Sequence, residues 1–319
     1  MRQSEFDCRS HPNLQRVLPA ITMITTTITP QNTLSLLKPR PSDSHKGTFG
    51  TVNAVVGCAR YRGAATLSVM GALRSGAGIV RLCSTEKVCS AVTVQYPSAT
   101  LLPLPETDEG LISMDSVPLL LKTVKKEDSL LIGCGLGQCA DTANTVNRML
   151  ISARCKKVVD ADALNLIAPI ETLGMIKNQK SLCRSIITPH VGEAARLMGR
   201  SISDVSENVE SAALEITKEL GCVTVLKSHK TVIAVPDEDT LYISELGNSG
   251  LSKGGSGDVL AGLIAGFIAQ GYTEKESALL GVCIHGIAAD LCAKERSMQA
   301  MLPSDLDTYI CKVFREIEK

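Results

Sequence analysis

The sequence predicts one α/β domain of three layers, in which helices cover both faces of a mainly parallel β-sheet. Short β-branched runs alternate with longer helical patterns from Thr51 onward. Such alternation is typical of strands joined by right-handed helical crossovers. At 319 residues the chain is long enough to bury the core that this fold needs.

The first half of the pattern begins with the strand-like run TVNAVVG, a helical pattern over residues 64–75 and the strand-like run GIVRLCS. Two further strand-like runs lie in the segments LLIGCGLG and KKVVDADAL. Each is short, apolar and followed by a polar or glycine-rich turn, as expected of buried strands that lead into helices.

The second half begins with a strand over residues 185–187 that leads into the helix AARLMG. Two strands joined by a tight turn at residues 228–230 predict an antiparallel edge of the sheet. A glycine-rich loop then leads into a helix that starts near Gly257, and a last helical pattern covers residues 274–294. Residues 40–317 are expected to form the single domain. Residues 1–39 are expected to form a mobile extension with one short helix near residues 34–37.

Composition excludes several classes of function. Formal net charge is zero and the chain has only 5 Tyr, 4 Phe and no Trp, so nucleic acid is not an expected partner. The 12 cysteines are spread along the chain without a CxxC pair, which favours reduced thiols in a cytoplasmic protein. The apolar run at residues 259–269 is about half a membrane span, so no transmembrane helix is expected.

The most informative segment is the loop at residues 248–258, NSGLSKGGSGD, which precedes an apolar helix. Glycines allow the backbone amides to turn inward, and the helix start adds partial positive charge, so Gly255, Ser256 and Gly257 form a candidate anion hole. Asp258 lies at the helix start. Its carboxylate can serve as a cap, or as the base that a phosphoryl-transfer enzyme needs.

Three further turns follow predicted strands, at the edge where open α/β sheets bind ligands. The first, GCGLG at residues 133–137, is either a tight turn or a binding loop. The second carries Asp160 and Asp162, which could approach a magnesium-bound phosphate through water or cap a helix. The third carries His190 and Glu193, where His190 is either a ligand contact or a structural residue. His285, in an apolar helical pattern, is expected in the core.

Taken together and in order, these motifs resemble the NAD(P)H-hydrate dehydratase family of the ribokinase-like superfamily. The resemblance covers about residues 40–295. The matching segments are HKGTFGTVNAVVG, YRGAATLSVMGALRSGAGIVRL, GCGLG, VVDADALN, ITPHVGEAARL, VLKSHKTVIAVPD, GGSGDVLAGLIAGFIAQG and IHGIAADL.

The resemblance implies a ribokinase-like fold and a repair enzyme. Its substrates would be NADHX and NADPHX, the forms of NADH and NADPH hydrated at carbon 6 of the nicotinamide ring. ADP or ATP would phosphorylate that hydroxyl and phosphate would then leave. Mg²⁺ is the implied phosphate counterion, with its ligands undetermined. The resemblance also implies that the chain forms a homo-oligomer, often a tetramer in the family, and that a separate NAD(P)H-hydrate epimerase works with it.

By motif position, the resemblance implies that Asp258 is the catalytic base and faces the hydrate. The residues implied to bind the hydrated dinucleotide are Ala64, Gly137, His190, Val191, Gly192, Glu193, Ala194, Ala195 and Arg196. The residues implied to bind the nucleotide are Lys227, Ser228, His229, Lys230, Thr231, Asn248, Ser249, Gly250, Leu251, Ser252, Lys253, Gly254, Gly255, Ser256 and Gly257.

The chain departs from the family pattern at Cys134, Val191 and Ser228, where the family usually has Pro, Pro and Gly. These departures affect loop shape and nucleotide preference more than the reacting groups. The alternatives are a superfamily kinase for a small vitamin precursor, which would form a stable phosphoester, and a nucleotide-binding sensor without turnover. An NAD-dependent dehydrogenase is disfavoured because GxGxxG and its downstream acid are absent.

Overall fold

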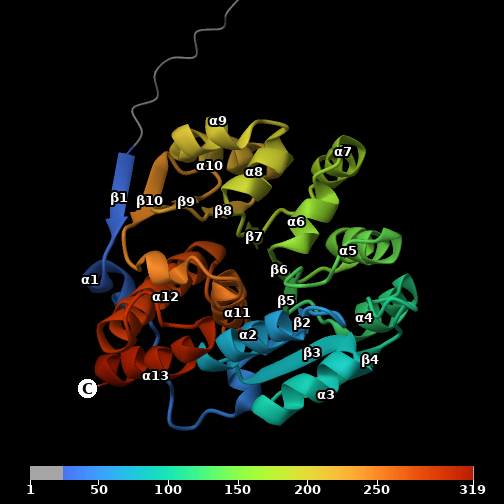
Figure 1. The fold of residues 1–319 in the computed structure, drawn as a ribbon, viewed down its shortest axis with the longest axis horizontal. Coiled ribbons are helices and arrows are strands. Elements are labelled where there is room, and N and C mark those ends of the chain that lie inside the picture. The colour runs from blue at the N-terminus through green and yellow to red at the C-terminus, as the bar shows by residue number, and fades with distance from the viewer. Residues whose placement is uncertain (1–23, 319) are drawn as a thin grey trace, which may run out of the picture.

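The computed structural model describes residues 24–318 and consists of a central sheet between two layers of helices (Figure 1). Within these residues ten strands form one sheet in the order β1-β10-β9-β8-β7-β6-β5-β2-β3-β4. The strands are β1 (Ile24–Ile28), β2 (Thr51–Val55), β3 (Ile79–Thr85), β4 (Thr100–Leu104), β5 (Ser129–Ile132), β6 (Lys156–Val159), β7 (Ser185–Ile187), β8 (Val223–Leu226), β9 (Thr231–Ala234) and β10 (Thr240–Ser244).

The sheet is parallel except at β9, which runs antiparallel to both β8 and β10. Every residue of β5, β7 and β8 is buried, as expected of parallel strands that helices cover on both faces. The hairpin around residues 228–230 is confirmed. Its second strand is not at the sheet edge, however, because β10 and β1 pair beyond it.

One layer of helices covers one face of the sheet, and a second layer covers the opposite face (Figure 1). The first layer contains α2 (Arg62–Arg74), α3 (Glu86–Gln95), α11 (Ser256–Ala269), α12 (Glu274–Arg296) and α13 (Leu306–Ile317). The second contains α4 (Val117–Thr123), α5 (Ala140–Ser152), α6 (Asp162–Ile167), α7 (Ile170–Asn178), α8 (Val191–Met198), α9 (Ile202–Glu207) and α10 (Val209–Leu220). The three-layer prediction is therefore confirmed.

Short helices connect these elements. A four-residue helix, α1, follows β1 and contacts α12. The short helices are α1 (Pro30–Thr33) and the 3₁₀ turns η1 (Leu34–Leu36), η2 (Lys46–Phe49), η3 (Met114–Ser116), η4 (Ser249–Leu251) and η5 (Pro303–Asp305).

The structure differs from the sequence prediction at residues 24–39, which were expected to lie outside the domain. β1 pairs in parallel with β10, from Ile24 opposite Thr240 to Ile28 opposite Ser244. Ile28 is buried, whereas Ile24 is exposed. A strand of sequence ITTTI at a sheet edge is held mainly by backbone hydrogen bonds, so it carries little apolar pattern. The short helix expected near residues 34–37 is the 3₁₀ turn η1. The prediction for residues 1–23 lies outside the described residues.

Helix α12 has the length and apolar composition of a membrane span, although 72% of its most apolar 18-residue window is buried inside the fold. The sequence analysis had considered only residues 259–269. An all-round apolar helix of this kind is typical of a buried core element, and α12 packs between α11, α13 and the sheet.

Glycines bring α2 and α11 into close contact. A Cβ on Gly71 would lie 2.3 Å from the Val259 carbonyl oxygen, and one on Gly262 would lie 2.2 Å from the Ser68 carbonyl oxygen. Both distances are too short for any side chain. The pairing of α2 and α11 is therefore set by glycine, and it fixes where the first turn of α11 lies.

We expect Gly262→Ala to lower the free energy of unfolding by about 1–3 kcal/mol, because the added methyl group must push two backbones apart. Gly174→Ala is the matched control, since it is also in a helix and a Cβ there meets nothing within 4 Å. The control should be neutral or stabilise the fold by up to about 1 kcal/mol. Denaturant unfolding of both variants measures the difference, and equal stabilities would contradict the close-contact account.

Candidate active site

The glycine-rich loop ends where α11 begins, as the sequence predicts. Gly255 has φ +104°, in the left-handed region, and a Cβ there would lie 2.4 Å from Leu67 Cδ1. Gly257 lies in the first turn of α11, and a Cβ there would lie 3.2 Å from Lys227 Nζ. The backbone conformation and the packing at residue 255 therefore both require glycine. At residue 257, glycine allows the helix start to approach the Lys227 ammonium group.

Hydrogen bonds to α12 and to the segment after it also hold the glycine-rich loop. The Asp290 carboxylate on α12 accepts hydrogen bonds from the Gly247 amide and from Asn248 Nδ2, each at 3.0 Å. Lys253 Nζ donates to the carbonyl oxygens of Gln299 and Met301. These contacts hold the loop in shape, and they occupy the Lys253 ammonium group, which the sequence analysis had assigned to the nucleotide.

A second glycine turn, residues 133–137, follows β5 and lies beside the start of α2. Gly133, Gly135 and Gly137 all have positive φ, between 61° and 130°. A Cβ on Gly135 would lie 2.7 Å from the Ala64 Cβ. The structure thus places Ala64 next to this glycine turn, and three left-handed positions explain the repeated glycines.

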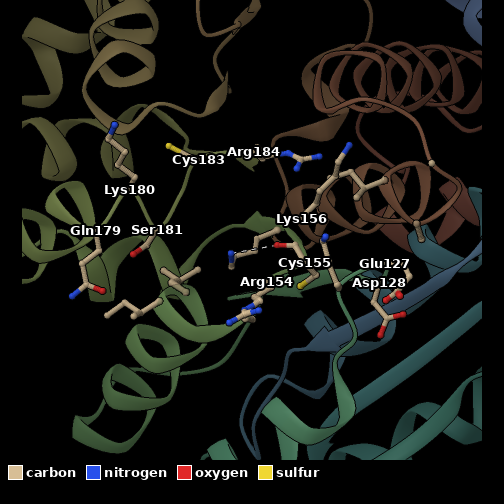
Figure 2. Close-up of a pocket in the computed structure, with 18 residues that line it drawn as sticks. Glu127, Asp128, Arg154, Cys155, Lys156, Gln179, Lys180, Ser181, Cys183 and Arg184 are labelled. Atoms are coloured by element: carbon tan, nitrogen blue, oxygen red, sulfur yellow. Dashed lines mark hydrogen bonds between the residues drawn. The ribbon is translucent and has the colours of Figure 1, made fainter.

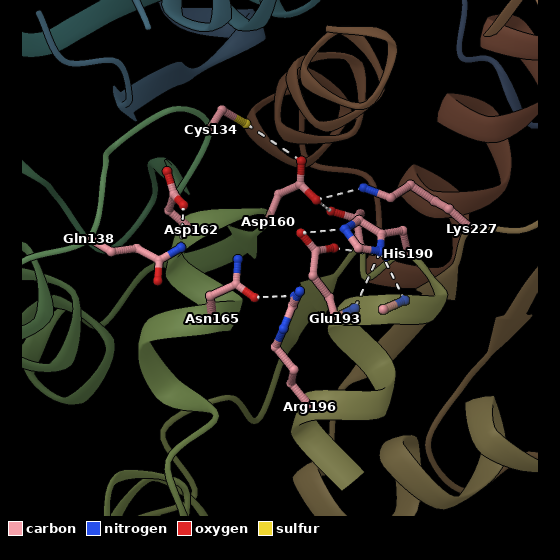
Figure 3. Close-up of polar contacts among 11 residues, drawn as sticks. Cys134, Gln138, Asp160, Asp162, Asn165, His190, Glu193, Arg196 and Lys227 are labelled. Carbon is pink, nitrogen blue, oxygen red and sulfur yellow. Dashed lines mark hydrogen bonds and ion pairs between the residues drawn. The ribbon is translucent and has the colours of Figure 1, made fainter. Parts of the chain in front are cut away.

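Asp160, directly after β6, is the centre of the polar network in Figure 3. It is 1% exposed. Its Oδ1 accepts hydrogen bonds from Lys227 Nζ at 2.8 Å and from Thr188 Oγ1 at 2.7 Å. The Cys134 thiol lies 3.7 Å from Oδ2 as a weak donor. Burial raises the pKa of this thiol well above its usual range, and the charges of Asp258 and Asp160 add to that effect, so the thiol stays protonated.

Lys227 lies at the end of β8 and reaches across to Asp160. Burial alone would lower the pKa of this lysine, but the charges of Asp160 and Glu193 outweigh burial and raise it. The ammonium group therefore stays charged at neutral pH. A charged lysine beside Gly257 supplies the positive charge that phosphate oxygens need.

Asp258, in the first turn of α11, is half-buried and close to Asp160. One carboxylate oxygen of each residue and the Cys134 sulfur lie within 4.8 Å of one another. Burial and the Asp160 charge raise the pKa of Asp258 to about 7, against the smaller opposing effect of Lys227. A carboxylate with a pKa near 7 can accept and release a proton at physiological pH, which is the property of a general base.

His190 and Glu193 form the start of α8. His190 Nδ1 accepts hydrogen bonds from the amides of Gly192 and Glu193, and Glu193 Oε2 accepts one from the His190 amide. His190 is therefore the N-cap of α8, which is the structural role that the sequence analysis had left open. Its ring remains half-exposed, with Nε2 3.3 Å from Glu193 Oε1.

The pKa values of His190 and Glu193 are both shifted by burial and by neighbouring charges. Burial lowers the pKa of His190, and the neighbouring cations Lys227 and Arg196 lower it further. Burial raises the pKa of Glu193 to about 7, with Lys227 opposing. The imidazole is therefore largely neutral at pH 7, and Glu193 is a second carboxyl group that titrates there.

The opposite rim of the site is formed by α6 and its neighbours (Figure 3). Asp162 accepts hydrogen bonds from the Gly137 amide at 2.8 Å and from Gln138 Nε2 at 2.9 Å. Arg196 Nη1 donates to Asn165 Oδ1 at 2.8 Å. Between Asp160 and Asp162 the chain turns through Ala161, which has φ 51°. This turn sends the two acids to different partners, so they do not form a carboxylate pair.

Several predicted site residues do not present their side chains to this network. Ala194 and Ala195 are 0% and 2% exposed and belong to the hydrophobic core below α8, because they lie on the inner face of the helix. Lys230, in the hairpin turn after β8, pairs with Glu245 at 2.6 Å on the surface. Contact of the alanines with a ligand is therefore possible only through their backbone.

The remaining predicted residues lie in the segments expected of them. Val191 and Gly192 are in the first turn of α8, and Gly254 is in the loop before α11. The Ser256 side chain is buried, and its Oγ has no hydrogen-bond partner in the described residues. Thr231 begins β9 and Ser252 directly follows η4. The rest occupy the hairpin turn and the 3₁₀ turn η4: Ser228, His229, Ser249, Gly250 and Leu251.

Sequence reasoning did not assign roles to three polar residues that the structure brings into the site, Thr188, Gln138 and Asn165, and it did not predict that Asp160 pairs with Lys227. Thr188 and Asp160 complete the Lys227 network, while Gln138 and Asn165 bind Asp162 and Arg196. A signal was available only for Asp160 and Thr188, because each follows a buried strand directly, at the sheet edge where α/β proteins bind ligands.

Magnesium fits this donor set only in part. Among the described residues, Cys134, Asp160 and Asp258 form a compact group that could hold an ion. Carboxylate oxygens suit Mg²⁺, but a protonated thiol does not, and Asp160 is already bound by Lys227 and Thr188. The residues therefore fit an ion bound mainly through phosphate oxygens, with at most one or two carboxylates from the chain.

The chain is similar to known proteins over most of its length. A family model described as NAD(P)H-hydrate dehydratase matches residues 52–312. The ADP-dependent (S)-NAD(P)H-hydrate dehydratase of Neisseria meningitidis is 37% identical over 269 residues, covering 84% of this chain and 85% of that protein. The bifunctional NAD(P)H-hydrate repair enzyme Nnr of Moorella thermoacetica is 37% identical over 285 residues, covering 89% of this chain and 53% of that protein. The chain thus spans about half the length of such bifunctional relatives.

Solved structures give the same assignment. The ADP/ATP-dependent NAD(P)H-hydrate dehydratase from Bacillus subtilis, co-crystallised with ATP/Mg²⁺, superposes with a TM-score of 0.77 at 28% identity, over 93% of this chain and 100% of that chain. A ribokinase-like superfamily protein from Enterococcus faecalis gives a TM-score of 0.78 at 26% identity, over 92% and 96%. The fold is therefore ribokinase-like, and the chain belongs to the NAD(P)H-hydrate dehydratase family.

Proposed function

We propose that the chain catalyses the ADP- or ATP-dependent dehydration of the S-epimer of NAD(P)H hydrate to NAD(P)H. The observation that carries the proposal is the position of Asp258. Its carboxyl group has a pKa raised to about 7, and it lies in the first turn of α11, one residue from Gly257 and close to the Lys227–Asp160 pair.

The first step is phosphorylation of the hydroxyl group at carbon 6 of the hydrated ring. Asp258 removes the hydroxyl proton as the oxygen attacks the terminal phosphorus of the nucleotide, and the bond from that phosphorus to the bridging oxygen breaks. The amides of Gly255 and Gly257 and the positive end of α11 stabilise the charge on the transferred phosphoryl group. Lys227 contributes a fixed positive charge beside them. The Ser256 amide, which the sequence analysis had included in the anion hole, donates instead to the Lys253 carbonyl oxygen at 3.2 Å.

The second step is elimination. The ring nitrogen donates its electron pair, the carbon–oxygen bond to phosphate breaks, and the proton lost from the adjacent carbon restores the dihydropyridine. With ATP, one hydrate and one ATP thus yield NAD(P)H, ADP, inorganic phosphate and a proton. The role of the chain here is to hold the leaving phosphate in the same anion hole.

Mg²⁺ in this proposal neutralises the phosphates of the bound nucleotide and thereby lowers the barrier to phosphoryl transfer. The co-crystallisation of the Bacillus subtilis relative with ATP/Mg²⁺ supports its use. Asp258 and Asp160 offer the nearest carboxylate oxygens.

The proposal includes partners and location. Bifunctional relatives of about twice this length are named repair enzymes, which supports pairing of this chain with a separate epimerase. The cysteines that the structure describes are all free thiols, which fits the reducing conditions of the cytoplasm. The homo-oligomer, in which a tetramer is possible, is retained from the family resemblance.

The direct test is incubation of the chain with the S-epimer of hydrated NADH, Mg²⁺ and either ADP or ATP. Recovery of the absorbance of the reduced nicotinamide ring, with one phosphate released per NADH formed, is the expected result. A stable phosphoester without ring recovery would indicate a kinase instead. Comparison of the two nucleotides measures the preference.

We expect Asp258→Asn to lower kcat by about 10²- to 10⁴-fold, because it removes the general base. Nucleotide affinity should be retained, since the amides and Lys227 are unchanged. The melting temperature should not fall, because the change removes a poorly solvated charge. Asp108→Asn, at an exposed site in a turn, is the matched control and should keep full activity. Normal turnover of Asp258→Asn would exclude the mechanism.

We expect kcat/KM to rise with pH through about 7, because Asp258 acts as a base only when deprotonated and its pKa is raised to about 7. Asp160→Asn removes a negative charge that contributes to this raised pKa, so the acid limb of its pH profile should move to lower pH. Steady-state kinetics from pH 5 to 9 measure both profiles. An acid limb unchanged by Asp160→Asn would contradict the electrostatic account.

A further inference from the structure

A cavity of about 360 Å³ lies at the amino-terminal ends of the central strands. The glycine-rich loop lies at their carboxyl-terminal ends. It is lined by residues that immediately precede β5, β6 and β7, such as Asp128, Cys155 and Arg184 (Figure 2). The candidate active site is built from residues that follow the same strands. Because the three strands are parallel, the cavity and the active site lie at opposite ends of the sheet.

The cavity lining is strongly basic. It contains two carboxylates, Glu127 and Asp128, against six lysine and arginine side chains. Asp128 Oδ2 accepts hydrogen bonds from Asn53 Nδ2 and the Lys125 amide, and its carboxylate counts toward the charge of the lining. The six basic residues are Lys126, Arg154, Lys156, Lys157, Lys180 and Arg184.

Only two of the six cations have an acidic partner within residues 24–318. Lys156 and Arg184 both approach Glu274, at 3.1 and 3.7 Å. Arg154 and Lys180 line the cavity as exposed residues and form no ion pair with the described chain. The lining therefore keeps an excess of positive charge, with six cations against Glu127, Asp128 and the neighbouring Glu274.

Lys157, in β6, is the unusual member of this set. It is 5% exposed, yet its ammonium group donates only to the Cys155 carbonyl oxygen, at 3.3 Å. Burial lowers its pKa. A buried lysine without a carboxylate partner is rare and costly in a stable fold, whereas an anion in the cavity would supply the missing charge.

A second buried polar group lines the same cavity. Ser181 is 8% exposed, and its hydroxyl oxygen has no hydrogen-bond partner in the described residues. Unpartnered buried hydroxyl groups are uncommon in folded proteins. Ser181 can donate one hydrogen bond to an oxyanion in the cavity that Lys157 and Arg154 also line.

We propose that this cavity, defined by Arg154, Lys157, Lys180 and Ser181, binds a small anion of the phosphate class that carries two or more negative charges. Its volume suits pyrophosphate or a phosphorylated metabolite of about nucleotide size. Arginine and lysine donors with one hydroxyl group match phosphate oxygens in number and charge. The site is separate from the proposed reaction centre, so its occupant can act while the active site is filled.

The test is isothermal titration of inorganic pyrophosphate into the chain without added nucleotide, because a nucleotide at saturating concentration would itself fill the cavity. Binding at one site is expected. Arg154→Ala/Lys180→Ala should weaken it by at least about tenfold, because two charged hydrogen-bond donors are lost. Lys157→Met should do the same. The double variant changes only exposed side chains and is expected to fold even if Lys157→Met does not.

The matched control is Lys122→Ala/Lys218→Ala, which removes two exposed lysines outside the cavity and should leave the affinity unchanged. Equal weakening in this control, or no binding to the unmutated chain, would overturn the proposal. A parallel titration with AMP distinguishes a free inorganic anion from a phosphate carried on a metabolite. Pyrophosphate bound at the glycine-rich loop would not be affected by the cavity variants, because their residues lie at the other end of the sheet, so the variants decide the question.

Discussion

The ion pair between Asp160 and Lys227 is the interaction on which the site depends. It joins the end of β6 to the end of β8 across the intervening strand β7, whose following residue, Thr188, also binds Asp160. Burying two charges is favourable only when each is well paired. Burial of Asp258 is the main reason that its pKa is raised, and the Asp160 charge raises it further. Because Asp160 is almost fully buried, its charge acts on Asp258 through little water.

The backbone brings the remaining parts to this pair. Gly71 and Gly262 allow α2 and α11 to touch, and that contact determines where the first turn of α11 lies. Gly255 then turns the chain into α11 with a left-handed φ of 104°, and Gly257 leaves room for the lysine. The Ser256 amide donates to the Lys253 carbonyl oxygen at 3.2 Å, so the anion hole consists of the Gly255 and Gly257 amides. The glycines therefore act at two levels: some set the distance between helices, and others shape the anion hole.

Much of the architecture could be predicted from the sequence, because its signals are local. The strands β5 and β7, the helix after the glycine-rich loop and the β8–β9 hairpin all coincide with periodic runs and turn residues. β1, β4 and β10 were missed. β1 is threonine-rich and β4 contains Pro103, so neither has the pattern of a buried strand, and in β10 only Leu241 and Ser244 are buried. The Asp160–Lys227 pair joins residues 67 positions apart, so only the three-dimensional fold could reveal it.

The central claim is that the fold holds Asp258 as a carboxyl group that titrates near neutrality. The most direct measurement is ¹³C NMR of the chain labelled at the aspartate carboxyl carbons, with the Asp258 signal assigned by its loss in Asp258→Asn, followed from pH 3 to 9. A titration midpoint of about 7 is the result predicted by burial beside Asp160. A midpoint near the ordinary value of 3.8 would contradict the account.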